Sequence, residues 1–171
     1  MSDASAPRPR PGGGWLRPVA VAAICATVTA AIGGTLTDIG PWYQHLNKPD
    51  WQPPPPAFGV IWTTIFALCT LAAVLAWRRI RADVARREWM IGVFALNGFL
   101  NVLWSLLFFR LHRPDWALAE VGFLWLSIAG LMLFLFRISR TAGGLLAPYL
   151  LWVSIASVLN FTIVRMNGPF G

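Results

Sequence analysis

The sequence is poor in charge, and this scarcity sets its class. Only 12% of its 171 residues are Asp, Glu, Lys or Arg, whereas 57% are hydrophobic; a soluble domain is nearer a quarter charged. The composition is therefore typical of a membrane protein. A spanning helix needs roughly 20 mostly apolar residues. Five segments meet this requirement: 19–36, 57–77, 90–109, 116–136 and 145–164. The alternating segments of a barrel are missing, so the sequence predicts an all-α membrane protein, a bundle of five transmembrane helices.

Several kinds of chemistry are also missing. No charged residue lies near the centre of a predicted span, where ion-coupled transporters normally carry one. His45 and His112 both lie in predicted loops, so no intramembrane pair can hold a haem iron. Cys25 and Cys69 lie in different spans, and no P-loop, nucleophile elbow, HExxH or CxxC motif is present. We therefore expect no metal site, no obligatory cofactor, and neither hydrolase nor ion-coupled transport activity.

The basic residues divide unevenly between the two sides of the predicted bundle. One side carries ten: Arg8, Arg10, Arg17, Arg78, Arg79, Arg81, Arg86, Arg87, Arg137 and Arg140. The other carries four: Lys48, Arg110, Arg113 and Arg165. Cytoplasmic loops are enriched in Lys and Arg, so the pattern predicts the N-terminus inside and the C-terminus outside. It explains the net charge of +7 without a nucleic-acid partner.

The ends and the first loop complete the domain organisation. Residues 1–17 are rich in proline, glycine and charge, which predicts a disordered N-terminal tail before a transmembrane domain at 18–167. Residues 38–56 form a loop dense in proline and aromatic residues. Its run Pro53 to Pro56 predicts a stiff segment that ends at the start of the next helix. We interpret this loop as a lid that Tyr43 and Trp51 help to close; the alternative is a tight loop followed by ordinary core aromatics.

Two stripes of side chains follow helical spacing in the second and fifth predicted spans. Residues at i, i+4 and i+8 share one face of a helix. The stripes are Phe58, Trp62 and Phe66 in one span and Trp152, Ala156 and Asn160 in the other. The small side chain of Ala156 leaves a notch beside Trp152. Aromatic rings around such a space favour a flat hydrophobic ligand held by stacking and a few polar contacts.

The third predicted span carries a polar stripe of Asn97, Asn101 and Ser105, with Trp104 one position away. An amide facing lipid tails would be costly without a partner, so the stripe must face other helices or a cavity. We favour hydrogen bonding between helices for Asn97 and contact with a ligand for Asn101.

Two further features have structural interpretations. Small residues recur every four positions in the first span, which predicts close helix packing, within the bundle or against a second copy; they are Ala22, Ala26, Ala30 and Gly34. Glu120 lies about one turn inside the fourth span, where we expect it to reach the interface or to pair with Arg113.

Three blocks of the sequence carry a resemblance to a known family. They are WYQHLNKPDWQPPPPAFGVIWTTIF at 42–66, LNVLWSLLFF at 100–109 and LLAPYLLWVSIASVLNFTIVRMN at 145–167. With them the chain resembles the translocator protein (TspO/MBR) family, also called tryptophan-rich sensory proteins or peripheral-type benzodiazepine receptors. The resemblance implies a five-helix bundle, usually a homodimer, here with the third spans in contact. It also implies a bacterial cell membrane, with the outer membrane as the alternative.

The resemblance also implies ligands and site residues. Its ligands are tetrapyrroles such as protoporphyrin IX and haem, and in some members sterols such as cholesterol or benzodiazepine-type drugs. Motif position places the two prominent cavity tryptophans on Trp62 and Trp152, the candidates for catalysis if light-dependent porphyrin breakdown occurs. The resemblance further implicates Tyr43, Phe58, Phe66, Asn101, Trp104 and Ala156, to which we add Trp51.

These expectations combine into one functional prediction with two alternatives. We predict a membrane tetrapyrrole-binding sensor or carrier; the alternatives are a light-dependent porphyrin-degrading enzyme and a transporter of sterols or small lipophiles. The sequence departs from the family pattern at two places. Phe161 stands where the sterol motif has tyrosine, and the usual glutamine upstream of Asn101 is missing.

Overall fold

The structure is a computed structural model, which describes residues 16–170, and among these the chain is helical with no strand. The long helices are α1 (Leu16–Leu36), α3 (Pro55–Arg79), α4 (Val84–Ser105), α5 (Pro114–Ile138) and α7 (Ala147–Asn167). A π-helical turn, η1 (Leu106–Arg110), continues α4, and α2 (Pro41–His45) and α6 (Arg140–Gly144) are short. Within the described residues five helices are long and apolar enough to cross a membrane. The predicted fold class is thus confirmed.

The helix starts follow local chemistry. Proline occupies the first turn of α2, α3, α5 and α7, where a missing N–H costs nothing. The helix α3 therefore begins inside the proline run, at Pro55, two residues before the predicted start of that span. Asp83 caps α4 by accepting a hydrogen bond from the Arg86 N–H at 3.0 Å. Of the predicted tail, residues 1–15 lie outside the described part of the chain, and residues 16 and 17 belong to α1.

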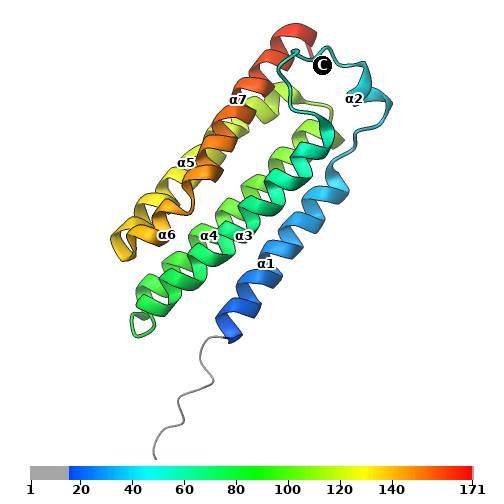
Figure 1. Ribbon diagram of the computed structural model, residues 1–171. Helices are drawn as coiled ribbons and strands as arrows, with labels where there is room; N and C mark the ends of the chain where they lie inside the picture. Colours follow the sequence, from blue (N-terminus) through cyan, green and yellow to red (C-terminus); the bar gives the residue numbers. More distant parts are fainter. Residues whose placement is uncertain (1–15, 171) are drawn as a thin grey trace, which may run out of the picture.

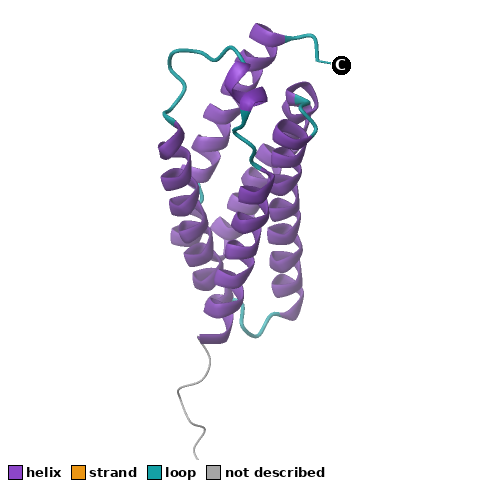
Figure 2. Cartoon of the chain, turned by 90° about the vertical axis from the view of Figure 1, so that its right-hand side faces the viewer, coloured by secondary structure: helices purple, strands orange, loops and turns teal. Residues whose placement is uncertain are grey.

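The five long helices run side by side along one axis (Figure 1). The helix α1 contacts α3 and α4, α4 contacts α5, and α5 contacts α7. Figure 2 shows the α3–α4 turn at one end of the bundle and the C-terminus at the other. The short helix α2 lies at the C-terminal end, and α6 lies at the opposite end (Figure 1). The described basic residues of the larger predicted group lie at the α6 end, because they flank the α3–α4 turn and the α5–α6 junction.

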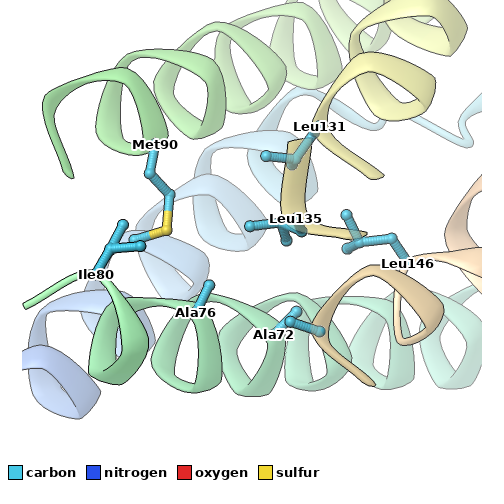
Figure 3. Close-up of a cluster of buried hydrophobic side chains, with 8 residues drawn as sticks. Ala72, Ala76, Ile80, Met90, Leu131, Leu135 and Leu146 are labelled. Carbon is cyan, nitrogen blue, oxygen red and sulfur yellow. The ribbon is translucent and has the colours of Figure 1, made fainter. Parts of the chain in front are cut away.

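The buried core lies in α3 to α7 and leaves α1 aside. At the α6 end, Figure 3 shows Met90 of α4 and Leu131 and Leu135 of α5 over the small residues Ala72 and Ala76 of α3. A second cluster, centred on Ile128 and Trp152, lies further along toward α2. No side chain described on α1 is buried. The bundle therefore has a packed part and one peripheral helix.

Two long-range connections hold the end of the bundle that carries α2. Asn167, the last residue of α7, accepts a hydrogen bond from the Asn47 N–H at 2.7 Å and donates one to the Asn47 carbonyl at 2.8 Å. We call this pair of hydrogen bonds the Asn167 latch. Arg110 of η1 donates to the Thr35 carbonyl at 3.0 Å and so ties the end of α1 to the end of α4. The loop between α1 and α3 is thus anchored on both sides.

Candidate functional site

A cavity of about 890 Å³ occupies the half of the bundle nearest α2. Its walls come from α1, α3, α4 and α7, and Val121 and Leu124 of α5 close one side. Tyr43 of α2 and Ile39 border it from the loop. The volume lies within the roughly 300–1,000 Å³ that is usual for small-molecule sites.

The structure brings eight of the nine predicted site residues to this cavity: Tyr43, Phe58, Trp62, Phe66, Asn101, Trp104, Trp152 and Ala156. The ninth, Trp51, is 50% exposed and is not among the residues that line it. Trp51 lies in a turn that precedes α3. The lid contact therefore comes from Tyr43 alone of the predicted pair.

The aromatic wall is built from mutual ring contacts. Trp62 stacks on Phe66 with ring centroids 5.6 Å apart, and Trp62 meets Tyr149 edge-on at 6.0 Å. Phe58 meets Trp152 edge-on at 5.5 Å and so joins α3 to α7 across the cavity. Contacts of this kind fix ring orientations, which leaves preformed flat surfaces for a ligand.

The π-turn η1 carries a cavity ring that was not among the predicted site residues. Phe109 lines the cavity and lies edge-on to Trp104 at 5.9 Å, whereas its neighbour Phe108 is buried and stacks on Trp104 at 5.0 Å. A π-turn shifts the helical register by one residue and is frequent at functional sites. Phe109 lies four residues after Ser105, so the next step of the α4 stripe reaches it, but the predicted stripe ended at Ser105.

The polar stripe of α4 forms a chain of hydrogen bonds with α7 and α5. Asn101 Nδ2 donates to Tyr149 Oη at 3.3 Å, Tyr149 Oη donates to Asn97 Oδ1 at 3.2 Å, and Asn97 Nδ2 donates to Ser127 Oγ at 2.9 Å. We call these four residues the Tyr149 chain. Asn97 thus makes the bonds between helices that we favoured for it. Asn101 makes such a bond and also lines the cavity.

Asn160 does not share the cavity with its stripe neighbours Trp152 and Ala156. It is 1% exposed and packs against the start of α5. With its amide turned to suit its neighbours, Nδ2 donates to the Pro114 carbonyl at 3.0 Å and Oδ1 accepts from the Leu118 N–H at 3.1 Å. Its role is to hold α7 against the first turn of α5.

Two sequence-based expectations need correction. Glu120 does not pair with Arg113, because Arg113 Nε donates to Asp115 Oδ1 at 2.8 Å, two residues along the chain. Glu120 is instead 6% exposed, and neither carboxylate oxygen has a hydrogen-bond partner among the described residues. The small residues Ala26, Ala30 and Gly34 of α1 line the cavity. Their lack of bulk makes room for the cavity, and the close approach of α1 to α4 falls at Thr29 and Gly98.

Tyr43 closes the cavity at the loop end. The ring centroids of Tyr43 and Phe109 lie 5.6 Å apart, and Lys48 Nζ lies 4.5 Å from the centroid of the Tyr43 ring. Burial raises the pKa of Tyr43 above its ordinary value, and a hydrogen bond with the Gln52 side chain partly opposes this shift. The phenol therefore stays protonated at neutral pH and retains its hydrogen-bonding proton.

The position of the sterol motif lies outside the cavity. Phe161 is exposed on α7, and the Arg165 guanidinium lies 5.8 Å from the centre of its ring. Neither residue lines the cavity.

The fold and the site define an integral membrane protein of helical-bundle type with an aromatic cavity inside the bundle. The model of the TspO/MBR family matches residues 20–166, and the chain belongs to this family.

Curated relatives agree with this assignment. The chain is 35% identical to "Tryptophan-rich protein TspO" of Chlorobaculum tepidum over 154 residues, which cover 85% of this chain and 94% of the relative. It is 35% identical to "Tryptophan-rich sensory protein" of Cereibacter sphaeroides over 115 residues, 64% of this chain and 70% of the relative. It is 28% identical to the human "Translocator protein" over 80 residues, 47% of each chain.

Proposed function

We propose that the protein is a membrane sensor or carrier that binds a flat tetrapyrrole, protoporphyrin IX or haem, in its aromatic cavity. The observation that carries this proposal is a preformed cavity of about 890 Å³ that Trp62, Trp104 and Trp152 line from three different helices. Rings on several walls offer stacking surfaces to a macrocycle. The names of the relatives, sensory and translocator proteins, support the role of sensor or carrier but not a particular ligand.

The cavity lining would hold the macrocycle and not its metal. No His, Cys or Met is among the lining residues, and these side chains are the commonest axial ligands of haem iron. Tyrosine can also serve, but Tyr43 lies in the lining with a pKa raised by burial, so its phenol keeps the proton that an iron ligand would lose. His112, the histidine next to η1, stacks on Trp42 at 4.2 Å instead. Protoporphyrin IX and haem should therefore compete for one site with affinities within a few-fold of each other.

The test is a titration of the purified protein in lipid nanodiscs with protoporphyrin IX in the dark, followed by quenching of tryptophan fluorescence. Trp62→Ala and Trp152→Ala should each weaken binding about tenfold, because loss of one stacking surface costs roughly 1–1.5 kcal/mol. Trp89→Ala is the matched control, since Trp89 is 70% exposed at the far end of α4. Quenching that does not saturate, or that all three variants leave unchanged, would contradict the proposal.

Light-dependent porphyrin breakdown is the second candidate, and one arrangement favours it. Trp62, which lines the cavity, lies edge-on to the buried ring of Tyr149, with centroids 6.0 Å apart, so a second oxidisable ring contacts one that adjoins the proposed ligand position. Such a reaction would consume dioxygen as oxidant. In light and air, an enzyme would cause the porphyrin absorbance to decrease. If this decrease stops in Trp152→Phe while the variant keeps its affinity for porphyrin in the dark, the protein is an enzyme. Equal loss in the variant and in empty nanodiscs would leave a binding protein.

Sterol transport is the less supported alternative. Phe161 supplies no hydroxyl where the sterol motif has tyrosine, and it lies apart from the cavity. Cholesterol should therefore fail to displace protoporphyrin IX. Displacement at equimolar concentration would revive this alternative.

We also propose an orientation and an assembly. The excess of basic residues at the α6 end supports a cytoplasmic position for that end and an outside position for the loop with α2. Two copies would associate through α4, whose outward face exposes Ile91, Leu96 and Phe99. Cysteine labelling at Asn47 from outside intact cells tests the orientation. Disulfide cross-linking of Phe99→Cys tests the assembly, and cross-links that form as readily at Phe123→Cys on α5 would contradict it.

A further inference from the structure

The Tyr149 chain has a defined hydrogen-bond polarity, and that polarity determines what Asn101 presents to the cavity. Ser127 Oγ lies 2.7 Å from the Leu124 carbonyl. A carbonyl oxygen can only accept, so the single hydroxyl hydrogen of Ser127 is used there. Ser127 must then accept from Asn97, and the donor at 2.9 Å is the Asn97 amide nitrogen.

The same reasoning continues along the chain to the cavity. With its nitrogen directed at Ser127, Asn97 turns its oxygen to Tyr149, whose hydroxyl donates to it at 3.2 Å. Tyr149 has no second hydrogen, so it accepts from the Asn101 nitrogen at 3.3 Å. Each amide orientation follows from the one before, and the sequence of bonds starts at a main-chain carbonyl that cannot reverse.

The outcome is a carbonyl oxygen at the cavity wall. Within residues 16–170 no group donates to Asn101 Oδ1, yet this oxygen is not fully enclosed. Asn101 is only 8% exposed and lines the cavity, so the open surface of its oxygen faces the cavity. One turn on, the Ser105 hydroxyl donates to the Asn101 main-chain carbonyl at 3.5 Å. Its only hydrogen is used there, so the lone pairs of Ser105 Oγ remain to accept a hydrogen bond. Indole N–H donors of the cavity belong to Trp62, Trp104 and Trp152. On the α4 wall the acceptor character comes from Asn101 and Ser105 and not from Trp104.

We propose that Tyr149, Asn97 and Ser127 are positioning residues that make Asn101 a hydrogen-bond acceptor, and that the cavity therefore selects flat ligands with an N–H or O–H group on the edge that meets α4. The inference rests on the proposed function in that it concerns the same cavity; on the edge of protoporphyrin IX or haem only a protonated propionic acid group would supply the O–H. It adds a chemical criterion that stacking alone does not supply. A ligand with a carbonyl at the same edge would face the Asn101 oxygen and lose affinity.

Three tricyclic probes of the same outline isolate this criterion: carbazole carries one N–H donor, fluorene carries neither donor nor acceptor, and fluorenone carries one carbonyl acceptor. Binding is measured in phosphatidylcholine nanodiscs, and empty nanodiscs give the correction for partition into lipid. The wild-type protein should bind carbazole roughly fivefold more tightly than fluorene, as expected for one hydrogen bond in a dry site. Fluorenone should bind more weakly than fluorene.

The variants test whether the chain sets this preference. Ser127→Ala removes the bond that starts the chain, and Tyr149→Phe interrupts it, so both free the Asn101 amide to rotate. In each, the ratio of carbazole to fluorenone affinity should fall roughly fivefold or more, with fluorene affinity within twofold of wild type. Ser154→Ala is the matched control, because Ser154 bonds Trp125 and the Leu150 carbonyl outside the chain; its ratio should not change. Asn101→Leu should abolish the preference.

The outcomes are distinct. A ratio that stays at the wild-type value in Ser127→Ala and Tyr149→Phe overturns the inference, as does a wild-type preference for fluorenone or a lack of saturable binding by all three probes. If Tyr149→Phe loses fluorene binding as well, its cavity is damaged and Ser127→Ala decides. Failure of the proposed function is a separate result, because protoporphyrin IX would then not bind while carbazole discrimination persists.

Discussion

Replacing Asn167 by alanine should make ligand exchange faster without changing ligand affinity. The Asn167 latch holds the loop between α1 and α3 to the end of α7 through two hydrogen bonds of 2.7 and 2.8 Å. Each such bond contributes about 0.5–1.5 kcal/mol net, and both are exposed, so we take the low end and about 1 kcal/mol for the pair. Loss of that amount favours loop opening about fivefold.

Association and dissociation should therefore both accelerate about fivefold. The latch touches the loop and α7 but not the cavity, so it stabilises the closed loop equally with and without ligand, and the equilibrium constant should stay within twofold. Stopped-flow quenching of tryptophan fluorescence by protoporphyrin IX gives the association rate. A chase with excess apoprotein, which captures the ligand as it leaves, gives the dissociation rate.

The chain offers a sharp control for this prediction. Asn47 joins the latch only through its main-chain N–H and carbonyl, so Asn47→Ala should leave both rates unchanged. Equal effects of the two substitutions would refute the reasoning. Unchanged rates in Asn167→Ala would show that the ligand enters and leaves by a route other than the loop.

Three further predictions follow from single side chains. Ala156→Leu should weaken protoporphyrin IX binding about tenfold or more, since overfilling a packed site costs roughly 1–3 kcal/mol; unchanged quenching titrations would place the ligand elsewhere. Glu120→Leu should raise the melting temperature, because it removes an unpartnered buried carboxyl that costs about 1 kcal/mol or more, and it should not affect porphyrin affinity; a lower melting temperature would reveal a partner for Glu120. The folded protein holds the Tyr43 proton more tightly than the unfolded chain does, so wild-type stability should fall as pH rises above the ordinary tyrosine pKa of 10.0, and Tyr43→Phe should remove that part of the decline in pH-dependent unfolding.

The parts of the site on regular helices were predictable from the sequence. Trp62 and Phe66 follow Phe58 at four-residue steps, and helical geometry alone puts them on one face. Trp152 and Ala156 were found by the same rule. The composition was sufficient for the five-helix bundle, because few other structures satisfy backbone hydrogen bonds in lipid.

The errors have different origins. Phe109 lies in the π-turn η1, four residues after Ser105, and was missed because the polar stripe of α4 was not followed beyond its last polar residue. Trp51 was placed at the cavity because the spacing of residues in a loop does not give the direction of a ring. Asn160 obeys the spacing of its stripe, yet it lies nearer the C-terminal end of α7, where its neighbour is α5 and not the cavity. Which surface a helical face meets depends on tertiary packing, and a single sequence does not contain that information.

The peripheral position of α1 has a consequence for how such a protein can change over evolutionary time. The helix contributes Ala26, Ala30 and Gly34 to the cavity but no buried side chain to the core. Substitutions on this wall would alter the size and shape of the ligand space while the packing among α3, α4, α5 and α7 stays intact. Most mutations reduce stability, whereas here the α1 wall of the cavity and the stabilising core lie on different helices. A protein built this way can change the shape of its cavity along one helix without disturbing its core.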